Sequence, residues 1–549
     1  LNDMKFIKGF LPAMLAFAVL TANAAGTVTG TVTSTDGKPL KGVYVSDGLK
    51  IVKTDSKGKY KIKSDKKDGT VFVITPTGYV APSKDGFQPG FWALLDKDNK
   101  KTETHDFVLQ PENQDNFTVM FPTDIHIINE SERDDLYKFE NIMLPGIKRI
   151  AADYSKNGPM YAMNLGDTSH DVFWYANDMK LDKVIKYLAE KEFPAMVYSV
   201  PGNHDNDGAI TGDNVDERAA WLYRQVLGPA QYSVNIGNTH WVMLDNILYR
   251  NDPPAKASEV GIKGNRKYDI GFTPEQIEWM KADIALVPDS MEIFIGCHAP
   301  LVFNRKHGTL LTDPAQLDQL NEIYNRFDKV TIVSGHAHRN LYQHKEKYPR
   351  FEQYVFLATS GCIWNTQPGC QVLGGDGSDG GIWLAQFGKD KTGNIEFRSY
   401  LPGNNMFRAY DLNEVGHYYK LDNVLAFQRE YYPDRVNYAD PEFTNKVMVN
   451  FWCDREGLTL EMLQNGKPLK VTKVDNLEDP LYNISYYAPA VLKERAYKKS
   501  HDNIGNAHMY IAQASDATSP VEVRVRDSKG NIVCSETVIR PKSFDRNAR

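Results

Sequence analysis

The sequence contains few cysteines, no long apolar run after its first residues and no cluster of basic residues. Five Cys in 549 residues exclude the small secreted proteins whose fold depends on disulfides. The formal charge of −6, from 64 basic and 70 acidic residues, gives no sign of the basic surface that attracts nucleic acids or anionic membranes. Apolar residues make up 42% of the chain, which is ordinary for a globular protein, and a chain of this length is expected to form about three or four domains.

The first residues have the pattern of a secretory leader. Two lysines precede an apolar stretch from Phe10 to Leu20, and a small-x-small triplet stands at 22–24. A stretch of about 11 residues is too short to span a bilayer, and the triplet matches a signal-peptidase site. We interpret residues 1–24 as a signal peptide and expect an exported protein, periplasmic or extracellular, without a transmembrane segment; the alternative is an N-terminal membrane anchor. In an oxidising compartment, either Cys362 and Cys370 or Cys453 and Cys534 could form a disulfide, and we favour the second pair.

The rest of the chain divides into three regions by its hydrophobic patterning. Residues 25–112 contain short alternating strands separated by Asp, Ser, Gly and Lys turns, which predicts a β-sandwich. Residues 113–400 alternate apolar strands with helical segments, which predicts a layered α/β domain. Residues 401–549 return to short strands and predict a second β-sandwich. The expected fold is therefore multidomain, with an α/β core flanked by two all-β sandwich domains.

Polar clusters follow the predicted strands of the α/β region. They are Asp124-Ile125-His126, Gly166-Asp167, Gly202-Asn203-His204-Asp205, His298 and Gly335-His336-Ala337-His338. Any one His alone is more often structural, but open α/β folds bind ligands at the carboxyl ends of their strands. Burying so many ionisable groups together is unfavourable unless a cation compensates, and this mixture of imidazole, carboxylate and amide suits Zn, Fe or Mn.

In order and spacing, these clusters resemble the motif set D-x-H, G-D, G-N-H-[D/E], H and G-H-x-H of the calcineurin-like metallophosphoesterases. The resemblance runs from Asp124 to His338. The run from Gly30 to Tyr60 is similar to the transthyretin-like modules of secreted bacterial proteins, and the three-part layout resembles secreted members of the family. The family implies an α/β/β/α sandwich and two divalent or trivalent metal ions, Mn, Fe or Zn. Carried over by position, the first metal is assigned to Asp124, His126, Asp167 and His338, and the second to Asp167, Asn203, His298 and His336.

The resemblance also implies the reaction. A metal-bound hydroxide would attack the phosphorus, and His204 would protonate the leaving oxygen as a general acid; a supporting role outside the reaction is the alternative for His204. After Asp167, the position that holds Tyr or Asp in some relatives is His170. Either His170 or Asp171 is a candidate partner of His204, and His170 is also a candidate phosphate contact or a packed imidazole.

The substrate is less defined by the sequence. A monoester carries one more negative charge than a diester and favours an extra Arg or Lys; because no motif supplies one, we favour a phosphodiesterase. The alternatives are a phosphomonoesterase of the acid phosphatase or nucleotidase type, and a catalytically silent surface-binding protein, in which a ligand residue should be missing. We expect a small-molecule or glycan-linked phosphoester and no nucleic acid, and the sequence specifies no oligomeric state. Some aromatic and acidic residues are candidates either for holding the alcohol part of the substrate or for ordinary packing: Trp174, Tyr175, Trp364, Asp376, Asp379 and Trp383.

Overall fold

The structure is a computed structural model that describes residues 26–130, 134–252, 260–302, 311–344, 347–361, 372–388, 391–403, 406–492 and 507–545. The segment interpreted as a signal peptide, 1–24, lies outside these residues. Within the described ranges, no helix has both the length and the apolar character needed to cross a membrane.

The N-terminal region forms two sheets of short strands. In β1 (Gly26–Ser34) every second side chain is buried, which is the period of a half-buried strand. The first sheet has the order β4 (Lys59–Ser64), β1, β9 (Phe107–Pro111), β6 (Tyr79–Val80), with β8 (Glu103–Thr104) beside β1. The second has the order β3 (Ile51–Lys53), β2 (Tyr44–Ser46), β5 (Thr70–Ile74), β7 (Trp92–Leu94). The predicted sheet-rich N-terminal domain is confirmed.

The central region contains two larger mixed sheets. One has the order β12 (Met196–Ser199), β11 (Met160–Asn164), β10 (Asn116–Phe121), β21 (Gly381–Gly388), β22 (Lys391–Ser399). The other has the order β13 (Tyr232–Ile236), β14 (Thr239–Leu244), β17 (Glu292–Cys297), β18 (Val330–Ser334), β20 (Phe351–Val355), β19 (Leu341–His344). The strands β10, β11 and β12 are mutually parallel, as are β14, β17, β18 and β20. A separate hairpin, β15 (Ile247–Arg250) and β16 (Lys267–Ile270), stands outside both sheets.

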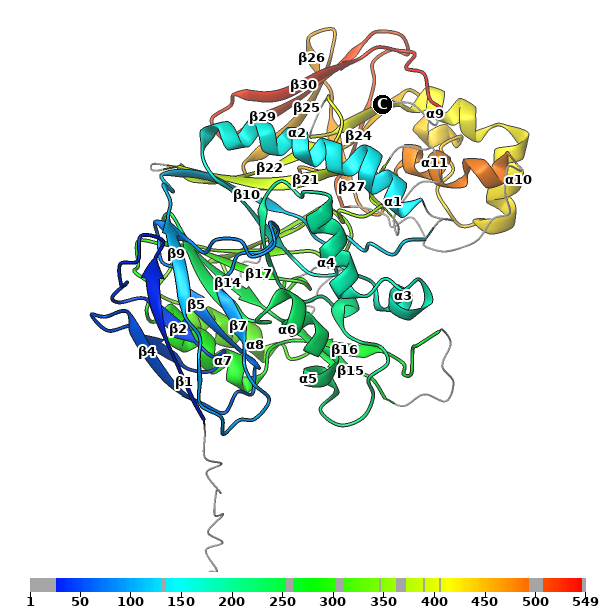
Figure 1. Cartoon of the computed structure of the whole chain (residues 1–549). Coiled ribbons are helices and arrows are strands. Elements are labelled where there is room, and N and C mark those ends of the chain that lie inside the picture. Colours follow the sequence, from blue (N-terminus) through cyan, green and yellow to red (C-terminus); the bar gives the residue numbers. More distant parts are fainter. Residues whose placement is uncertain are drawn as a thin grey trace, which may run out of the picture.

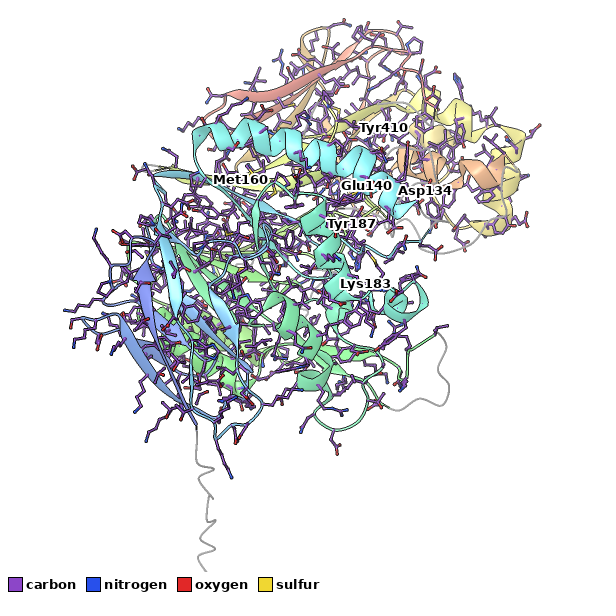
Figure 2. The ribbon with its side chains drawn as sticks, viewed as in Figure 1. Asp134, Glu140, Met160, Lys183, Tyr187 and Tyr410 are labelled. Atoms are coloured by element: carbon purple, nitrogen blue, oxygen red, sulfur yellow. The ribbon has the colours of Figure 1, made fainter. Side chains whose placement is uncertain are left out.

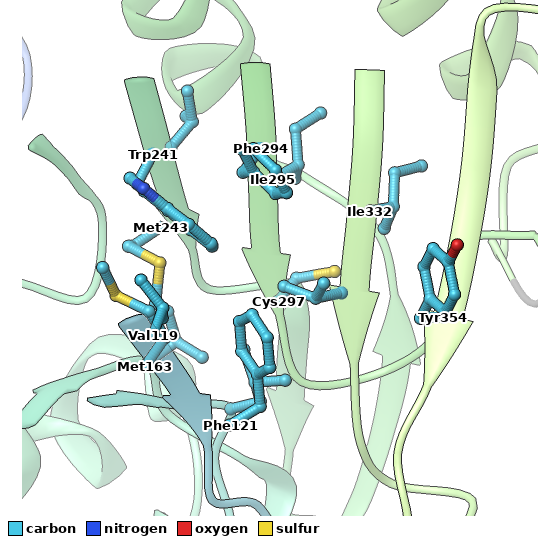
Figure 3. Packing of buried hydrophobic residues seen from close by; sticks show 14 of the residues in the cluster. Val119, Phe121, Met163, Trp241, Met243, Phe294, Ile295, Cys297, Ile332 and Tyr354 are labelled. Atoms are coloured by element: carbon cyan, nitrogen blue, oxygen red, sulfur yellow. The ribbon is translucent and has the colours of Figure 1, made fainter. Parts of the chain in front are cut away.

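The two central sheets pack against each other through apolar side chains, as Figure 3 shows. Val119, Phe121 and Met163 come from β10 and β11, and they face Trp241, Met243 and Cys297 from β14 and β17. The rings of Trp241 and Phe294 stack with centroids 4.3 Å apart. This close packing fixes the two sets of strand ends relative to each other, which positions the polar clusters that follow them.

Helices cover the outer faces of this pair of sheets (Figure 1). On one side lie α1 (Asp135–Lys138), a π-helical turn (Phe139–Met143), α2 (Leu144–Tyr154) and α4 (Leu181–Glu190). The buried residues of α4 recur with helical spacing at Leu181, Val184, Ile185 and Leu188. Its exposed side is joined to the π-helical turn by a 2.9 Å hydrogen bond from the Tyr187 hydroxyl to Glu140, both labelled in Figure 2.

The central region contains five further helices in the part of the chain that the structure describes. They are α3 (Asp171–Ala176), α5 (Val215–Ala219), α6 (Trp221–Leu227), α7 (Pro274–Ile284) and α8 (Ala315–Ile323), with single 3₁₀ turns at Ser155–Asn157 and Asn203–Asp205. The start of α7 is fixed by a capping box, in which Thr273 Oγ1 accepts from the Gln276 amide and Gln276 Oε1 accepts from the Thr273 amide. The predicted layered α/β core is thereby confirmed.

The C-terminal region also contains two sheets. One has the order β23 (Arg408–Asp411), β24 (Lys446–Asn450), β28 (Met509–Gln513), β27 (Val471–Val474), and the other has the order β26 (Lys467–Pro468), β25 (Leu458–Gln464), β29 (Val521–Asp527), β30 (Ile532–Val538). The predicted sheets are confirmed, but the sequence analysis missed helices α9 (Leu412–Tyr419), α10 (Asp422–Tyr431) and α11 (Pro480–Val491), and the 3₁₀ turn Pro441–Phe443. Cys453 is buried and Cys534 is partly buried, and their pairing as a disulfide stays a prediction; Cys362 and Cys370 lie outside the described residues. The domain boundaries after 112 and 400 stay predictions.

The N-terminal region and the central domain share one apolar core. Phe72 of β5 is buried, and its ring lies edge-on to Tyr232 and Trp279, with centroids 6.4 and 6.3 Å away. The Trp279 indole N–H donates to Ser46 Oγ of β2 at 3.0 Å. The two parts are therefore held together by apolar burial as well as by hydrogen bonds.

Phe72→Ala is expected to destabilise the protein by about 3–5 kcal/mol, because it removes a buried ring at this junction and leaves a cavity. The measurement is the free energy of unfolding in denaturant. Val108→Ala on β9 is the control, since Val108 is 45% exposed and its truncation should change stability by less than about 0.5 kcal/mol. Equal effects of the two substitutions would contradict a shared core.

Candidate metal centre

All seven predicted metal-binding residues lie at the carboxyl ends of parallel strands. Asp124 and His126 follow β10, Asp167 follows β11, Asn203 follows β12, His298 follows β17, and His336 and His338 follow β18. Because the two sheets pack together, these ends meet at one edge. The ligand atoms of Asp124, His126, Asp167 and His338 lie within 4.8 Å of one another, and so do those of Asp167, His298 and His336. We call these sets the first cluster and the second cluster.

Asp167 belongs to both clusters. Its Oδ2 atom lies 3.6 Å from His126 Nε2 of the first cluster and 3.2 Å from His298 Nε2 of the second. Asn203 joins the second cluster, since its Oδ1 lies 3.0 Å from His298 Nε2. The structure thus brings the predicted ligands together in the grouping that the sequence resemblance implies, with one shared carboxylate.

Backbone carbonyls orient two of the imidazoles. His126 Nδ1 lies 3.0 Å from the carbonyl oxygen of Ser169, and His298 Nδ1 lies 2.8 Å from that of Leu165. A proton on each Nδ1 donates to these carbonyls and leaves the Nε2 lone pair directed into the cluster. This is the arrangement that a metal-binding histidine requires.

The donor atoms also fit a cation on electrostatic grounds. His126 Nε2 and His338 Nε2 lie 3.4 Å apart, and Asp124 Oδ1 lies 2.9 Å from His338 Nε2. Asp124 Oδ1 is buried, and the polar atoms that approach it are imidazole nitrogens of the first cluster, His338 Nε2 and, at 3.9 Å, His126 Nε2. Buried acceptors that face one another are unfavourable unless a cation lies between them. The residues present therefore fit a metal pair.

Burial and charge shift the pKa values of the cluster residues in opposite directions. Burial by itself would raise the pKa of Asp124, but the neighbouring His338 lowers it below the usual range. Burial opposes protonation of His298, but the charge of Asp167 raises the pKa of His298 to about 9. Without a cation, a proton on His298 compensates the carboxylates, and a bound metal would displace it.

Five of the seven predicted ligand residues have strained backbones. Asp124, His126, Asp167, His336 and His338 all have φ between 47° and 64°, in the left-handed region that non-glycine residues rarely occupy. Such strain collects at functional sites, where the surroundings hold the residue in place.

Neighbouring glycines permit the close packing of these loops. At Gly202, a Cβ atom would lie 2.1 Å from Asp167 Oδ1, and at Gly335 it would lie 2.3 Å from Asp124 Oδ2. No other residue type fits at these positions.

His204 lies beside the clusters and is held by Asp171. Its Nδ1 is 2.7 Å from Asp171 Oδ1, and its backbone N–H donates to Asp167 Oδ1 at 2.7 Å. The Arg266 guanidinium donates to both oxygens of Asp171, at 3.0 and 2.9 Å. Burial opposes protonation of His204, but Asp167 and Asp171 raise its pKa overall. The side chain is 27% exposed, so one side of the ring is open to a ligand.

His170 packs on the face of the His204 ring, with centroids 3.8 Å apart and an angle of 28° between the planes. Burial lowers the pKa of His170 to about 4, which keeps it neutral near neutral pH. Of the two candidates that the sequence left open, Asp171 is thus the residue in hydrogen-bond contact with His204. His170, Asp171 and His204 also form a third group of possible ligands, but Arg266 already neutralises Asp171.

Sequence reasoning assigned no role to three residues that support the site. Asp205 accepts from the amides of Gly202 and Ser169, each at 3.0 Å, and burial raises its pKa to about 6. Its place next to His204 in the motif was the available signal. Arg266 and Tyr268 come from the β15–β16 hairpin, and the Tyr268 hydroxyl lies 3.3 Å from His336 Nε2. No sequence motif pointed to the hairpin.

The candidate substrate-binding aromatic residues that the structure describes all have hydrogen-bond partners within the protein. The Trp174 indole is buried and donates to Ser169 Oγ at 2.9 Å, and the Tyr175 hydroxyl donates to Asp207 at 2.9 Å. The Trp383 indole donates to Asn340 at 2.7 Å. Trp364 lies outside the described residues. Asp376 and Asp379 contact protein groups, as described below.

Comparison with family models covers most of the chain. The model described as calcineurin-like phosphoesterase matches residues 117–340. The models for the N-terminal and C-terminal parts of calcineurin-like phosphoesterases match residues 26–112 and 353–532. No curated protein matches the sequence.

The solved structures to which this chain is similar share little sequence with it. A dimetal phosphatase from Danio rerio is 14% identical, with a TM-score of 0.33 over 52% of this chain and 96% of its own. A 5'-nucleotidase from Candida albicans is 13% identical, with a TM-score of 0.30 over 52% of each chain. A putative 5'-nucleotidase from Staphylococcus aureus is 11% identical, with a TM-score of 0.31 over 53% of this chain and 55% of its own. These likenesses are too distant to bear on the substrate.

The family assignment therefore depends on the three family models, and the buried carboxylates and imidazoles are of the kind that a metal-dependent hydrolase needs. The chain belongs to the calcineurin-like phosphoesterases, as a member with N- and C-terminal extension domains, and is a metal-dependent phosphoric ester hydrolase.

Proposed function

We propose that this protein is an exported phosphodiesterase with two metal ions, the first held by Asp124, His126, Asp167 and His338 and the second by Asp167, Asn203, His298 and His336. The observation that carries the proposal is the shared position of Asp167 between two groups of buried donors. Two cations held close together need an anion between them, and one carboxylate meets that need. When bound, the metal pair supplies positive charge that polarises the phosphoryl group and activates water.

In this proposal the chain's own residues handle the leaving group. His204 Nδ1 donates to Asp171 at 2.7 Å, which leaves Nε2 as the proton donor to the departing oxygen. Asp171 is held in turn by Arg266 at 2.9 Å, so the ring of His204 has a fixed orientation. His170 covers one face of that ring and limits its rotation. Because the His204 ring is already oriented, it does not need to rearrange during the reaction.

A diester is favoured over a monoester because the charge near His204 is already balanced. Arg266 is engaged with both oxygens of Asp171, whereas the extra negative charge of a monoester favours an Arg or Lys that faces the phosphate. A panel of small mono- and diesters tests this choice directly. Faster turnover of monoesters under matched conditions would replace the proposal with a phosphomonoesterase. Export stays a prediction that depends on the leader-like segment 1–24.

Purified protein is expected to carry about two transition-metal ions per chain, and a chelator should abolish phosphoester hydrolysis. The physical reason is that bound cations stabilise the buried carboxylates and imidazoles of both clusters. Metal analysis before and after chelation, with activity regained on adding Mn²⁺, Fe²⁺ or Zn²⁺, is the measurement. Full activity of metal-free protein would rule out the proposed mechanism.

A further inference from the structure

Asp376 lies in the loop Leu373–Asp379, between the metal centre and the C-terminal domain. Its side chain is fully buried. Oδ2 accepts a hydrogen bond from the backbone N–H of Asn340 at 2.8 Å and lies 3.3 Å from Nε2 of His508. Oδ1 accepts from the backbone N–H of Ser378 at 3.0 Å. One carboxylate thus contacts the central domain and the C-terminal domain at the same time.

Asn340 is the second residue after His338 of the first cluster. Its side-chain Oδ1 accepts from the Trp383 indole at 2.7 Å and from the Leu357 amide at 3.1 Å, and its Nδ2 donates to Ser378 Oγ at 2.9 Å. The backbone and the side chain of Asn340 are therefore both fixed. His338 itself has a φ of 52°, a strained conformation that persists only when its surroundings hold it.

The C-terminal domain holds the other side of the loop. Asn450, at the end of β24, donates to the carbonyl of Asp376 at 2.9 Å, and Arg408 of β23 donates to the carbonyl of Gly377 at 2.7 Å. At Gly377, which has a φ of +77°, a Cβ atom would lie 2.1 Å from Cβ of Asp479. The two hydrogen bonds and the close approach of Gly377 to Asp479 leave the loop little freedom to move relative to the domain.

We infer that Asp376 is a positioning residue through which the C-terminal domain fixes His338, so that this domain is a required part of the metal centre. The inference depends on the proposed role of His338 as a metal ligand. Residues that orient a ligand typically contribute about 10–100-fold to metal affinity. The C-terminal domain would accordingly act on the metals without contacting them.

The test uses the full chain and Mn²⁺ as the probe. Asp376→Ala is expected to weaken one of the two Mn²⁺ sites by about 10–100-fold and to leave the other unchanged, because His338 belongs to the first cluster only. Asp376→Asn keeps an oxygen that can accept from Asn340 and should lose less affinity. His508→Phe removes the contact that the C-terminal domain makes with the Asp376 carboxylate and should weaken the same site toward the lower end of that range. Equilibrium dialysis against graded Mn²⁺ measures both sites.

Asp379→Ala is the matched control. Asp379 ends the same loop and pairs with Arg408 of the C-terminal domain, but no hydrogen bond joins it to Asn340 among the described contacts. The Asp379→Ala variant should therefore bind Mn²⁺ at both sites with wild-type affinity. Thermal melting of the metal-free proteins distinguishes loss of folding from loss of a metal site. If Asp376→Ala does not fold, Asp376→Asn replaces it as the test variant.

The inference is overturned if Asp376→Ala or His508→Phe binds Mn²⁺ with wild-type affinity. It is also overturned if Asp379→Ala loses as much Mn²⁺ affinity as Asp376→Ala. Either result would leave the proposed function intact. A wild-type protein that binds no Mn²⁺, Fe²⁺ or Zn²⁺ would instead overturn the proposed function, and the inference with it.

Discussion

Asp167→Asn is expected to weaken metal binding at both clusters and to lower the rate of hydrolysis by more than about 100-fold, the upper value for residues that only support a ligand. Asp167 Oδ2 lies 3.6 Å from His126 Nε2 and 3.2 Å from His298 Nε2, so it faces both groups of donors. An amide removes the negative charge between the two cations. Asn can still accept the backbone N–H of His204, which Asp167 Oδ1 accepts at 2.7 Å, so the substitution isolates the charge from the fold.

Asp124→Asn is the matched comparison for this prediction. Asp124 belongs to the first cluster only, and its Oδ2 accepts from Thr123 Oγ1 at 2.7 Å and from the His336 amide at 2.9 Å. The Asp124→Asn variant should lose one metal, whereas Asp167→Asn should lose two. Metal content and rate are measured on the same samples. If Asp167→Asn keeps near-wild-type metal content and rate, the assignment of Asp167 as the shared ligand is wrong.

The order of the ligand residues was predictable because each follows a strand. Apolar runs such as those at β10 and β18 mark buried strands, and the polar residues after them must meet where parallel strands end. The pairing of strands into two sheets is not readable from those runs, since any of several orders would bury the same residues. The grouping of ligands therefore came from the family resemblance, and the structure contains the same grouping.

The supporting residues were less predictable, because they act across long separations in sequence. Arg266 contacts Asp171 across 95 positions, and Tyr268 contacts His336 across 68. Neither belongs to a motif, and both are placed by a hairpin whose position depends on the packed domain. Asp171 and His170 are neighbours in sequence, so only side-chain geometry distinguishes the hydrogen-bond partner of His204 from the ring stacked on it.

Helix α11 of the C-terminal domain was missed for a different reason. In α11 (Pro480–Val491) apolar and tyrosine residues occupy nearly every position, so the helix has no polar face that would reveal its period. Its buried tyrosines pack with those of α9 and with residues that follow α10, in one cluster that also includes Leu373 at the start of the loop that carries Asp376. Tertiary packing, which the local pattern does not encode, decides the structure there.

His204→Ala is expected to keep both metals but to slow hydrolysis by an amount that depends on the leaving group. An ester with an alkyl alcohol needs its oxygen protonated as the bond breaks, whereas a nitrophenolate leaves without that help. General acid catalysis contributes about 10²–10⁴-fold, so the alkyl ester should slow by up to that factor and the nitrophenyl ester by far less. Rates for both esters, with metal content determined on the same protein, provide the measurement.

A second buried histidine and aspartate pair supplies the control. His240 Nε2 lies 2.9 Å from Asp283 Oδ2, and its Nδ1 lies 2.8 Å from Asn235 Oδ1, within the central domain but outside both clusters. His240→Ala should lower stability and leave the ratio of the two rates unchanged, because His240 has no contact with the leaving group. Asp171→Asn should shift the ratio in the same direction as His204→Ala, since Asp171 orients the His204 ring. Equal slowing of both esters, with half of the metal lost, would identify His204 as a ligand and not as the proton donor.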